Sequence, residues 1–279
     1  MLFQIKSYFK FLWKSRNAHG IHSPFVFDLV TKCFYDHTNY PEYSILKNYR
    51  NSLLQNKNTI EVTDFGAGSK VFKSNTRAIS KIAETAGIAS ENSELLFRIS
   101  KYFQPEKVLE IGTSLGLATS ALSMGSKNSQ ILTLEGCPET SKTAQSEFQK
   151  FNLNNIDIKI GEFQETFSSF DFRLLTFDLI YVDGNHQKAA TLQYFDLLLP
   201  TVNNDSIWIF DDIHWSADME EAWEIIKKNP VVTVTIDTFQ WGIVFFRSEQ
   251  KKEDFVIRSN NSKTLSAILG IINGYGLLQ

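Results

Sequence analysis

The chain has 279 residues, 43% of them apolar, and a formal net charge of −3 at pH 7. This length suits one large domain or one domain with an extension, and the apolar share suits a globular core. The mild negative charge disfavours nucleic acid as a partner, and two cysteines, Cys33 and Cys137, provide neither a disulfide framework nor a zinc motif. No stretch approaches the roughly 18 uninterrupted apolar residues of a membrane span, so we expect a cytoplasmic protein.

Residues 1–90 differ from the rest of the chain and are expected to form a helical N-terminal cap. Residues 2–14 mix aromatic with basic side chains and predict an amphipathic helix. Packing of this helix on its own protein is favoured, and binding to a membrane surface is the alternative. Ser23 is placed to cap a helix that begins at Pro24.

Two further features of this region carry weaker signals. His19 and His22 lie three residues apart, but the glycine between them argues against one continuous helix. Metal ligation by this pair is therefore disfavoured, and contact with a substrate is the better alternative. Residues 64–68 form an acidic, glycine-rich turn, and residues 70–86 after it predict a basic helix. We interpret the turn as part of the cap, with a lid over a bound ligand as the alternative.

From about residue 91, strand-like segments alternate with helix-like segments. The expected strands are 107–111, 130–134, 156–160, 177–182, 206–210, 231–237 and 242–247. Alternation with helices predicts βαβ units and a parallel sheet, whereas the last two strands are too close for a crossover helix and should pair antiparallel. We predict an α/β, Rossmann-like fold over residues 91–250, with a seven-stranded, mostly parallel sheet that ends in an antiparallel hairpin. The role of the tail, residues 251–279, stays open.

Four acidic residues end predicted strands. They are Glu110, Glu135, Asp183 and Asp211. In an open parallel sheet, ligands bind beyond the carboxyl ends of the strands. The four acids are therefore expected on one rim that faces a ligand.

A glycine turn follows the first strand of this sheet. Gly112 and Gly116 allow positive φ and a close approach of the backbone to a ligand, and the turn presents N–H groups near the start of the next helix. Glu135, at the end of the next strand, could accept both hydroxyls of an adenosine ribose. A dinucleotide fingerprint has a middle glycine that makes room for a pyrophosphate. Thr113 and Ser114 stand there instead, which favours S-adenosylmethionine over NAD.

Three segments resemble motifs of class I methyltransferases, in particular the branch of the catechol and caffeoyl-CoA O-methyltransferases. They are residues 108–116, 132–135 and 178–186, and the resemblance covers about residues 91–247. It implies that S-adenosylmethionine is the cofactor, with Gly161 and Glu162 near its adenine. The full set of expected cofactor-binding residues is Glu110, Gly112, Thr113, Ser114, Gly116, Glu135, Gly136, Gly161, Glu162 and Asp183.

The resemblance also implies a catalytic site on the rim. Metal-dependent members hold magnesium through positions that match Asp183, Asp211 and Asp212, although the family has Asn where this chain has Asp212. Oxygen ligands suit magnesium, but the third carboxylate could also serve as a base. His186 stands where the family has a catalytic Lys and is our first candidate for the general base, with His214 as the second. In the alternative interpretation these acids only cap turns and helices.

We therefore expect S-adenosylmethionine-dependent methylation of an oxygen on a small-molecule acceptor, with magnesium as an optional second cofactor. Trp215 follows the fifth-strand acids and is the best candidate for a wall on the substrate side. An N-methyltransferase, an aminopropyl transferase and a catalytically silent adenosyl-binding protein are alternatives on the same fold. The identity of the acceptor and the choice between monomer and homodimer stay open.

Overall fold

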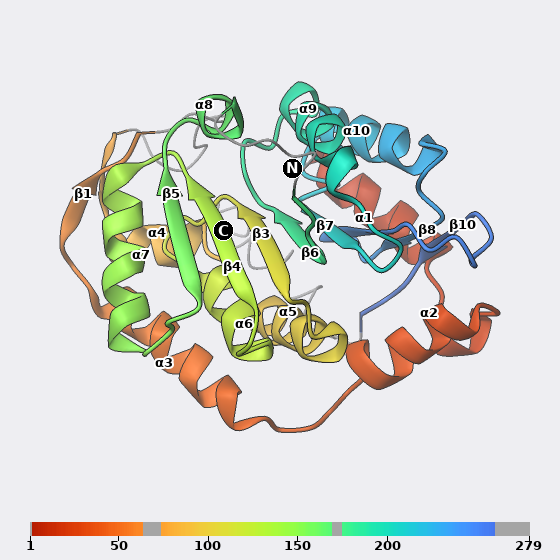
Figure 1. Cartoon of the computed structure of the whole chain (residues 1–279), viewed down its shortest axis with the longest axis horizontal. Coiled ribbons are helices and arrows are strands. Elements are labelled where there is room, and N and C mark those ends of the chain that lie inside the picture. Colours follow the sequence, from red (N-terminus) through yellow and green to blue (C-terminus); the bar gives the residue numbers. More distant parts are fainter. Residues whose placement is uncertain (1, 64–73, 169–174, 260–279) are drawn as a thin grey trace.

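The computed structural model describes residues 2–63, 74–168 and 175–259 of the chain. Figure 1 shows its central sheet with helices on both faces. The strands are β1 (Thr59–Glu61), β2 (Thr76–Ala78), β3 (Lys107–Ile111), β4 (Gln130–Glu135), β5 (Ile156–Ile160), β6 (Leu179–Val182), β7 (Ile207–Asp211), β8 (Val234–Asp237), β9 (Trp241–Phe245) and β10 (Glu253–Val256). The α-helices are α1 (Leu2–Lys14), α2 (Pro24–Leu29), α3 (Pro41–Gln55), α4 (Ile79–Thr85), α5 (Ser90–Phe103), α6 (Leu117–Gly125), α7 (Pro138–Lys150), α8 (Phe163–Ser168), α9 (Lys188–Leu198) and α10 (Ala217–Lys228), and the shorter helices are η1 (Ala18–Gly20), η2 (Val30–Phe34) and η4 (Leu199–Thr201).

The main sheet has the order β10-β8-β9-β7-β6-β3-β4-β5 over the described residues. The strands from β7 to β5 run parallel, and β9 pairs antiparallel with both β7 and β8. The predicted α/β class and terminal hairpin are thus confirmed. Every residue of β6 and β7 is buried, which is why these strands appear in the sequence as short apolar runs.

The sheet has eight strands within the described residues, so the predicted number of seven was too low. The additional strand is β10, which pairs parallel with β8 and lies in the segment that we interpreted as a tail. Its first two residues, Glu253 and Asp254, are exposed. An edge strand of this kind lacks the apolar run that marks a central strand, because only part of it is buried.

The N-terminal region confirms several local predictions and corrects one. The helix predicted over residues 2–14 is α1, and the Ser23 hydroxyl accepts a hydrogen bond from the Val26 N–H at the start of α2. The basic helix predicted over residues 70–86 is wrong in part, because β2 occupies Thr76–Ala78 and pairs with β1. The turn at residues 64–68 lies outside the described residues.

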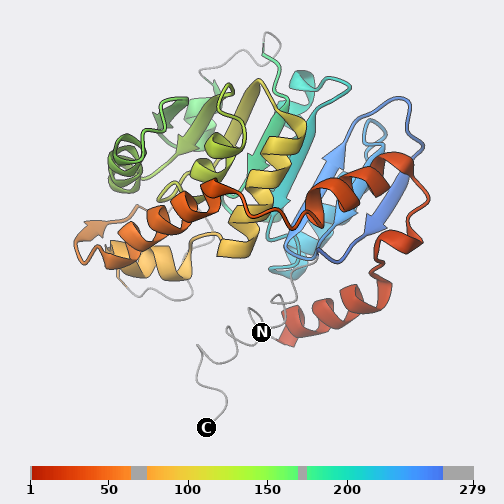
Figure 2. The same cartoon turned by 90° about the horizontal axis from the view of Figure 1, so that it is seen from below.

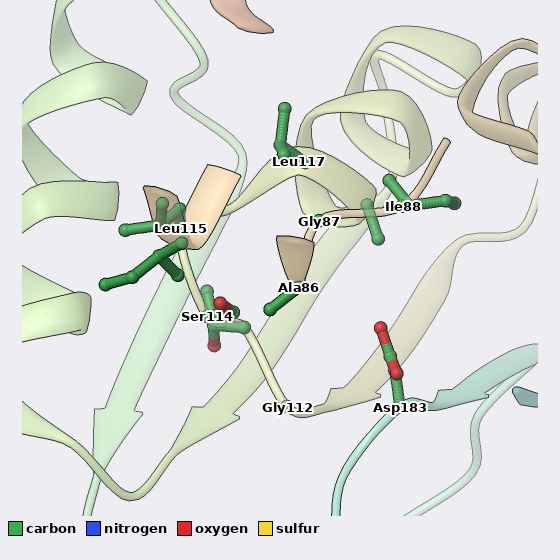
Figure 3. A pocket seen from close by; sticks show the side chains of 11 residues that line it. Ala86, Gly87, Ile88, Gly112, Ser114, Leu115, Leu117 and Asp183 are labelled. Atoms are coloured by element: carbon green, nitrogen blue, oxygen red, sulfur yellow. The ribbon is translucent and has the colours of Figure 1, made fainter. Parts of the chain in front are cut away.

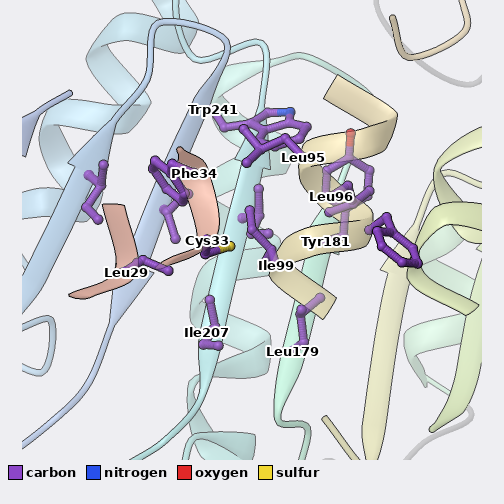
Figure 4. Close-up of a cluster of buried hydrophobic side chains, with 14 of the residues drawn as sticks. Leu29, Cys33, Phe34, Leu95, Leu96, Ile99, Leu179, Tyr181, Ile207 and Trp241 are labelled. Carbon is purple, nitrogen blue, oxygen red and sulfur yellow. The ribbon is translucent and has the colours of Figure 1, made fainter. Parts of the chain in front are cut away.

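The N-terminal region shares its core with the sheet. Leu29, Cys33 and Phe34 pack with Leu95 and other side chains of α5 against the strands (Figure 4). Figure 2 shows α2 and α5 on the same side of the sheet. The opposite face is covered by α9 and α10, which carry the buried Tyr194, Phe195 and Trp223 of a second cluster.

A buried arginine fastens this packing. The Arg98 guanidinium donates to the carbonyl oxygens of Cys33 and Phe34, at 2.9 and 3.3 Å, and to the Tyr43 hydroxyl at 2.9 Å. The last carbonyl groups of a helix have no hydrogen-bond donor within the helix. Here the guanidinium of Arg98 supplies donors to the last carbonyl groups of η2. The two cysteines are free and buried, as expected from their number and spacing.

One contact from α3 reaches the glycine turn between β3 and α6. Tyr49 is fully buried, and its hydroxyl donates a 2.9 Å hydrogen bond to the Leu115 carbonyl. A Cβ on Gly116 would lie 2.6 Å from that hydroxyl and 2.5 Å from the ring of Phe148. The turn therefore has its shape fixed from below by a residue of the N-terminal region.

We expect Tyr49→Phe to lower the free energy of unfolding by about 1–3 kcal/mol, because the buried Leu115 carbonyl loses its donor. Urea denaturation followed by circular dichroism measures this. Tyr102→Phe is the matched control, since Tyr102 is 37% exposed, and should change stability by less than about 0.5 kcal/mol. Equal stability of the two variants would show that the Tyr49 hydrogen bond contributes nothing.

Candidate active site

The glycine turn adopts the backbone that its sequence predicts. Gly112 and Gly116 have φ values of 99° and 77°, and Ser114 between them has a φ of 48°. A Cβ on Gly112 would lie 2.4 Å from the carbonyl oxygen of Asp183. Only glycine therefore lets the turn after β3 lie directly against the loop after β6, and this contact joins two parts of the predicted site.

Glu135, at the end of β4, is bound to the same turn. Its two carboxylate oxygens accept hydrogen bonds from the backbone N–H groups of Ser114, at 2.7 Å, and Cys137, at 2.9 Å. Burial raises the pKa of Glu135, while these N–H groups and that of Gly136 act in the opposite direction. The side chain is thus fixed in orientation beside the turn, as a ribose-binding acid must be.

Glu110 lies underneath the turn instead of on its surface. It is completely buried, and one carboxylate oxygen accepts 2.5 Å hydrogen bonds from the hydroxyls of Thr119 and Thr133. Its other oxygen is buried without a hydrogen-bond partner. Burial raises the pKa of Glu110 to about 7, so the carboxyl is half protonated near neutral pH. This predicted cofactor-binding residue supports the turn from the inside.

A shallow hollow that is open to solvent lies over the turn (Figure 3). Its floor includes Gly112 and Ser114, and its opposite wall is the segment from Ala86 to Ile88, between α4 and α5. The side chain of Asp183 points from the end of β6 into the same space. The N-terminal region therefore forms part of the candidate cofactor pocket.

The predicted rim of acids exists at the ends of β6 and β7. Asp183, Asp211 and Asp212 lie close enough that burial and their mutual repulsion raise the pKa of Asp183 well above its usual value. Burial and the charge of Asp212 raise the pKa of Asp211 to about 6. A side-chain hydrogen bond between Asp183 and Asp211 raises the pKa of Asp183 further, so the environment favours the protonated form of this carboxyl.

Gln240, in the turn between β8 and β9, is a part of this rim that the sequence analysis missed. Its side-chain amide donates 2.7 Å hydrogen bonds to one oxygen of Asp211 and one of Asp212. The register of β7 against β9 places Asp211 opposite Trp241, next to Gln240. The predicted antiparallel hairpin could have pointed to Gln240, because the turn of a hairpin that pairs with β7 must lie beside the end of β7.

The predicted magnesium site does not fit these contacts. One oxygen of Asp211 accepts from Gln240 and from the Asp212 N–H, and the other accepts from the Tyr181 hydroxyl at 3.0 Å. The amide of Gln240 bridges one oxygen of Asp211 and one of Asp212. Within the described ranges, which include all three aspartates, no group of Asp, Glu, His or Cys side chains is arranged to hold a metal ion.

The two candidate bases lie in different surroundings. The ring nitrogens of His186 lie 3.6 Å from a carboxylate oxygen of Asp183 and 3.9 Å from one of Asp212. His186 also keeps 30% of its side chain exposed, so it can meet an acceptor. His186 is therefore placed on the rim of acids, as predicted.

His214 points away from that rim. Its Nε2 lies 2.9 Å from Asp237, its Nδ1 lies 3.6 Å from Glu220, and its ring stacks on Phe239. Burial lowers its pKa, but the two carboxylates outweigh burial and the net shift is upward. A largely buried histidine whose two ring nitrogens both face carboxylates is poorly placed to meet a substrate, so the geometry disfavours this second candidate.

The remaining predicted residues lie as follows. The Gly161 N–H donates to the Glu135 carbonyl, and Glu162 is exposed at the start of α8. His19 and His22 are both exposed. Trp215 is half-buried in the loop between β7 and α10. No described contact tests the ligand-binding roles predicted for these residues.

Comparisons with known proteins agree with this geometry. Residues 109–213 match a family model described as a methyltransferase domain. A methyltransferase from Podospora anserina, solved with S-adenosylhomocysteine, superposes with a TM-score of 0.58 and 15% identity, over 82% of this chain and 97% of that one. A Klebsiella pneumoniae protein described as an O-methyltransferase superposes with a TM-score of 0.53 and 16% identity, over 78% of this chain and 95% of that one. A Staphylococcus aureus protein described as a caffeoyl-CoA O-methyltransferase superposes with a TM-score of 0.51 and 17% identity, over 60% of this chain and 89% of that one.

At these identities the solved structures show the fold, whereas the family match covers the segment that contains the glycine turn and the acids. The family match identifies residues 109–213 as a methyltransferase domain. The fold of the described residues is that of the solved methyltransferases. Within the described residues no helix is long and apolar enough to cross a membrane.

The raised pKa of Glu110 predicts a pH-dependent effect of Glu110→Gln. The pKa of Glu110 is higher in the folded chain, so its burial lowers the free energy of unfolding only where the carboxyl would ionise in the unfolded chain. This loss is absent below the ordinary pKa of 4.5 and grows as pH rises through about 7. The variant should therefore unfold at the same temperature as the wild type at pH 4.5 and at a higher one at pH 8. The gain at pH 8 is at most about 3 kcal/mol.

Calorimetry of the ligand-free proteins at the two pH values measures this difference. The exposed Glu106, changed to Gln, is the control and should show no pH-dependent gain. A constant difference between Glu110→Gln and wild type across this pH range would contradict an ionisation near 7.

Proposed function

We propose that the chain transfers the methyl group of S-adenosylmethionine to an oxygen of a small-molecule acceptor, with His186 as the general base and without a metal ion. The observation that carries the proposal is the hydrogen bond from the Ser114 N–H to Glu135. It fixes an acid that can bind ribose hydroxyls beside a glycine turn that lacks the middle glycine of a pyrophosphate-binding motif. The hollow over this turn is shared with Asp183, so cofactor and acid rim adjoin.

The residues around the turn suit the adenosyl cofactor. Gly112 and Gly116 leave the turn without side chains, and Glu135 offers a fixed carboxylate for hydroxyl groups. Bound S-adenosylmethionine supplies an activated methyl group on a sulfonium. The solved relatives from Podospora anserina and from Bacillus cereus are described as complexes with S-adenosylhomocysteine, which supports the same ligand class here.

The chemistry assigned to the protein is positioning and proton removal. Bound S-adenosylmethionine would supply the methyl group to the acceptor oxygen, and its sulfur would keep the electron pair of the carbon–sulfur bond. The hydroxyl proton goes to His186, because neither ring nitrogen is within 3.5 Å of a carboxylate. Asp212 and the Asp183–Asp211 pair then stabilise the imidazolium. The amide of Gln240 relieves the repulsion between Asp211 and Asp212 without a net charge.

Isothermal calorimetry tests the cofactor. We expect S-adenosylmethionine and S-adenosylhomocysteine to bind and NADH not to bind. Glu135→Gln should weaken binding about 10- to 100-fold, because hydrogen bonds to a charged acceptor are lost. Glu139→Gln, an exposed position on α7, is the control and should bind as the wild type does. Absence of S-adenosylmethionine binding by the wild type would disprove the proposed function.

Transfer of labelled methyl groups to a panel of phenols, catechols and sugars tests the base and the metal. We expect His186→Asn to lower kcat by about 10²- to 10⁴-fold while cofactor affinity is kept, because the base is lost. His37→Asn, at an exposed histidine between η2 and α3 to which no role is assigned, should leave the rate unchanged. EDTA should have no effect on the wild type. Loss of activity in EDTA that magnesium restores would show that a metal is required.

A further inference from the structure

Helix α1 has two faces of different character. Its inner face, with the buried Ser7, Tyr8 and Phe11, packs on the protein. Tyr8 and Phe11 contact the ring of Phe239, with centroid separations of 4.9 and 5.5 Å. The Ser7 hydroxyl donates to Glu220 at 3.0 Å, and Lys10 forms a 2.7 Å ion pair with the same carboxylate. These contacts fix the rotation of α1 and determine which residues face outward.

The outer face of α1 carries three large apolar side chains. Leu2, Phe9 and Trp13 are 84%, 67% and 88% exposed. Their spacing of seven and four residues places them on one side of a helix. Trp13 is the most exposed of the large apolar side chains in the described part of the chain. Burial of this face within the fold therefore contributes little to stability.

The same face is basic. Helix α1 contains Lys6, Lys10 and Lys14 and has no acidic residue, in a chain whose net charge is −3. Lys6 and Lys14 are exposed beside the apolar side chains. Lysine side chains of this length can keep their charge in water while their stems lie against apolar material. Figure 2 shows α1 at the periphery of the molecule, where a flat surface could reach it.

We propose that α1 docks the protein on an anionic membrane surface, with Leu2, Phe9 and Trp13 inserted at the level of the headgroups. A helix with apolar and aromatic residues between lysines lies in the plane of such a surface, and Trp is favoured at that depth. Charge complementarity selects this occupant over a second copy of the chain. A symmetric contact between two α1 helices would bring their lysines together without acidic partners.

Vesicle co-sedimentation at low salt is the first test, with vesicles of phosphatidylcholine alone or containing 30% phosphatidylglycerol. We expect the full chain to bind the anionic vesicles and to be released by salt. Phe9→Ala with Trp13→Ala should abolish binding, and Lys6→Gln with Lys14→Gln should weaken it roughly 30-fold. The controls Ile225→Ala with Val231→Ala remove exposed apolar groups elsewhere and should bind as the wild type does.

Fluorescence of Trp13 is the second test. Trp208, Trp223 and Trp241 are buried and Trp215 is half-buried in the loop after β7, so a lipid with brominated chains should quench mainly Trp13. Quenching by anionic vesicles that disappears in Trp13→Phe supports the proposal. Shielding of Trp13 from iodide before vesicles are added would overturn it, because another part of the chain or a second copy would then cover the face. Equal binding to neutral vesicles, or none to either kind, would overturn it as well.

Discussion

The contact between Gly112 and the Asp183 carbonyl is the constraint on which the site depends. Because a Cβ at residue 112 would lie 2.4 Å from that oxygen, the turn after β3 and the loop after β6 can meet only through a glycine. This contact brings the candidate cofactor turn and the acid rim together across neighbouring parallel strands. Tyr49 and Glu110 then fix the turn from the protein side, and Glu135 fixes it from the ligand side.

The acid rim shows how several carboxyl groups can be kept close together without a metal ion. The surroundings raise the pKa of Asp183, and the amide of Gln240 satisfies an oxygen on each of Asp211 and Asp212. Unpaired buried carboxylates would be costly, and these neutral donors offset part of that cost. Asp212 adds a third carboxylate to the rim, and its charge is accommodated by this network.

Much of the fold could be predicted because parallel strands are buried on both faces and therefore appear as apolar runs. The predicted bounds of β3 agree with the structure for this reason, and those of β5 agree because its isoleucines alternate with polar residues. Strand β10 was missed because its exposed Glu253 and Asp254 give no apolar run. Gly112 and Glu135 were predictable from their places at strand ends. Tyr49 and Gln240 were not, because each reaches the site by long-range packing that no local pattern records.

The turn between β8 and β9 belongs to two parts of the molecule at once. Phe239 contacts Tyr8 and Phe11 of α1, and its neighbour Gln240 binds Asp211 and Asp212. A ligand that binds at α1 and favours one conformation of this turn also favours that conformation at the acid rim, and the reverse holds. Thermodynamic linkage makes that coupling free energy equal in both directions. The inner face of α1 and the acid rim are therefore connected through two consecutive residues.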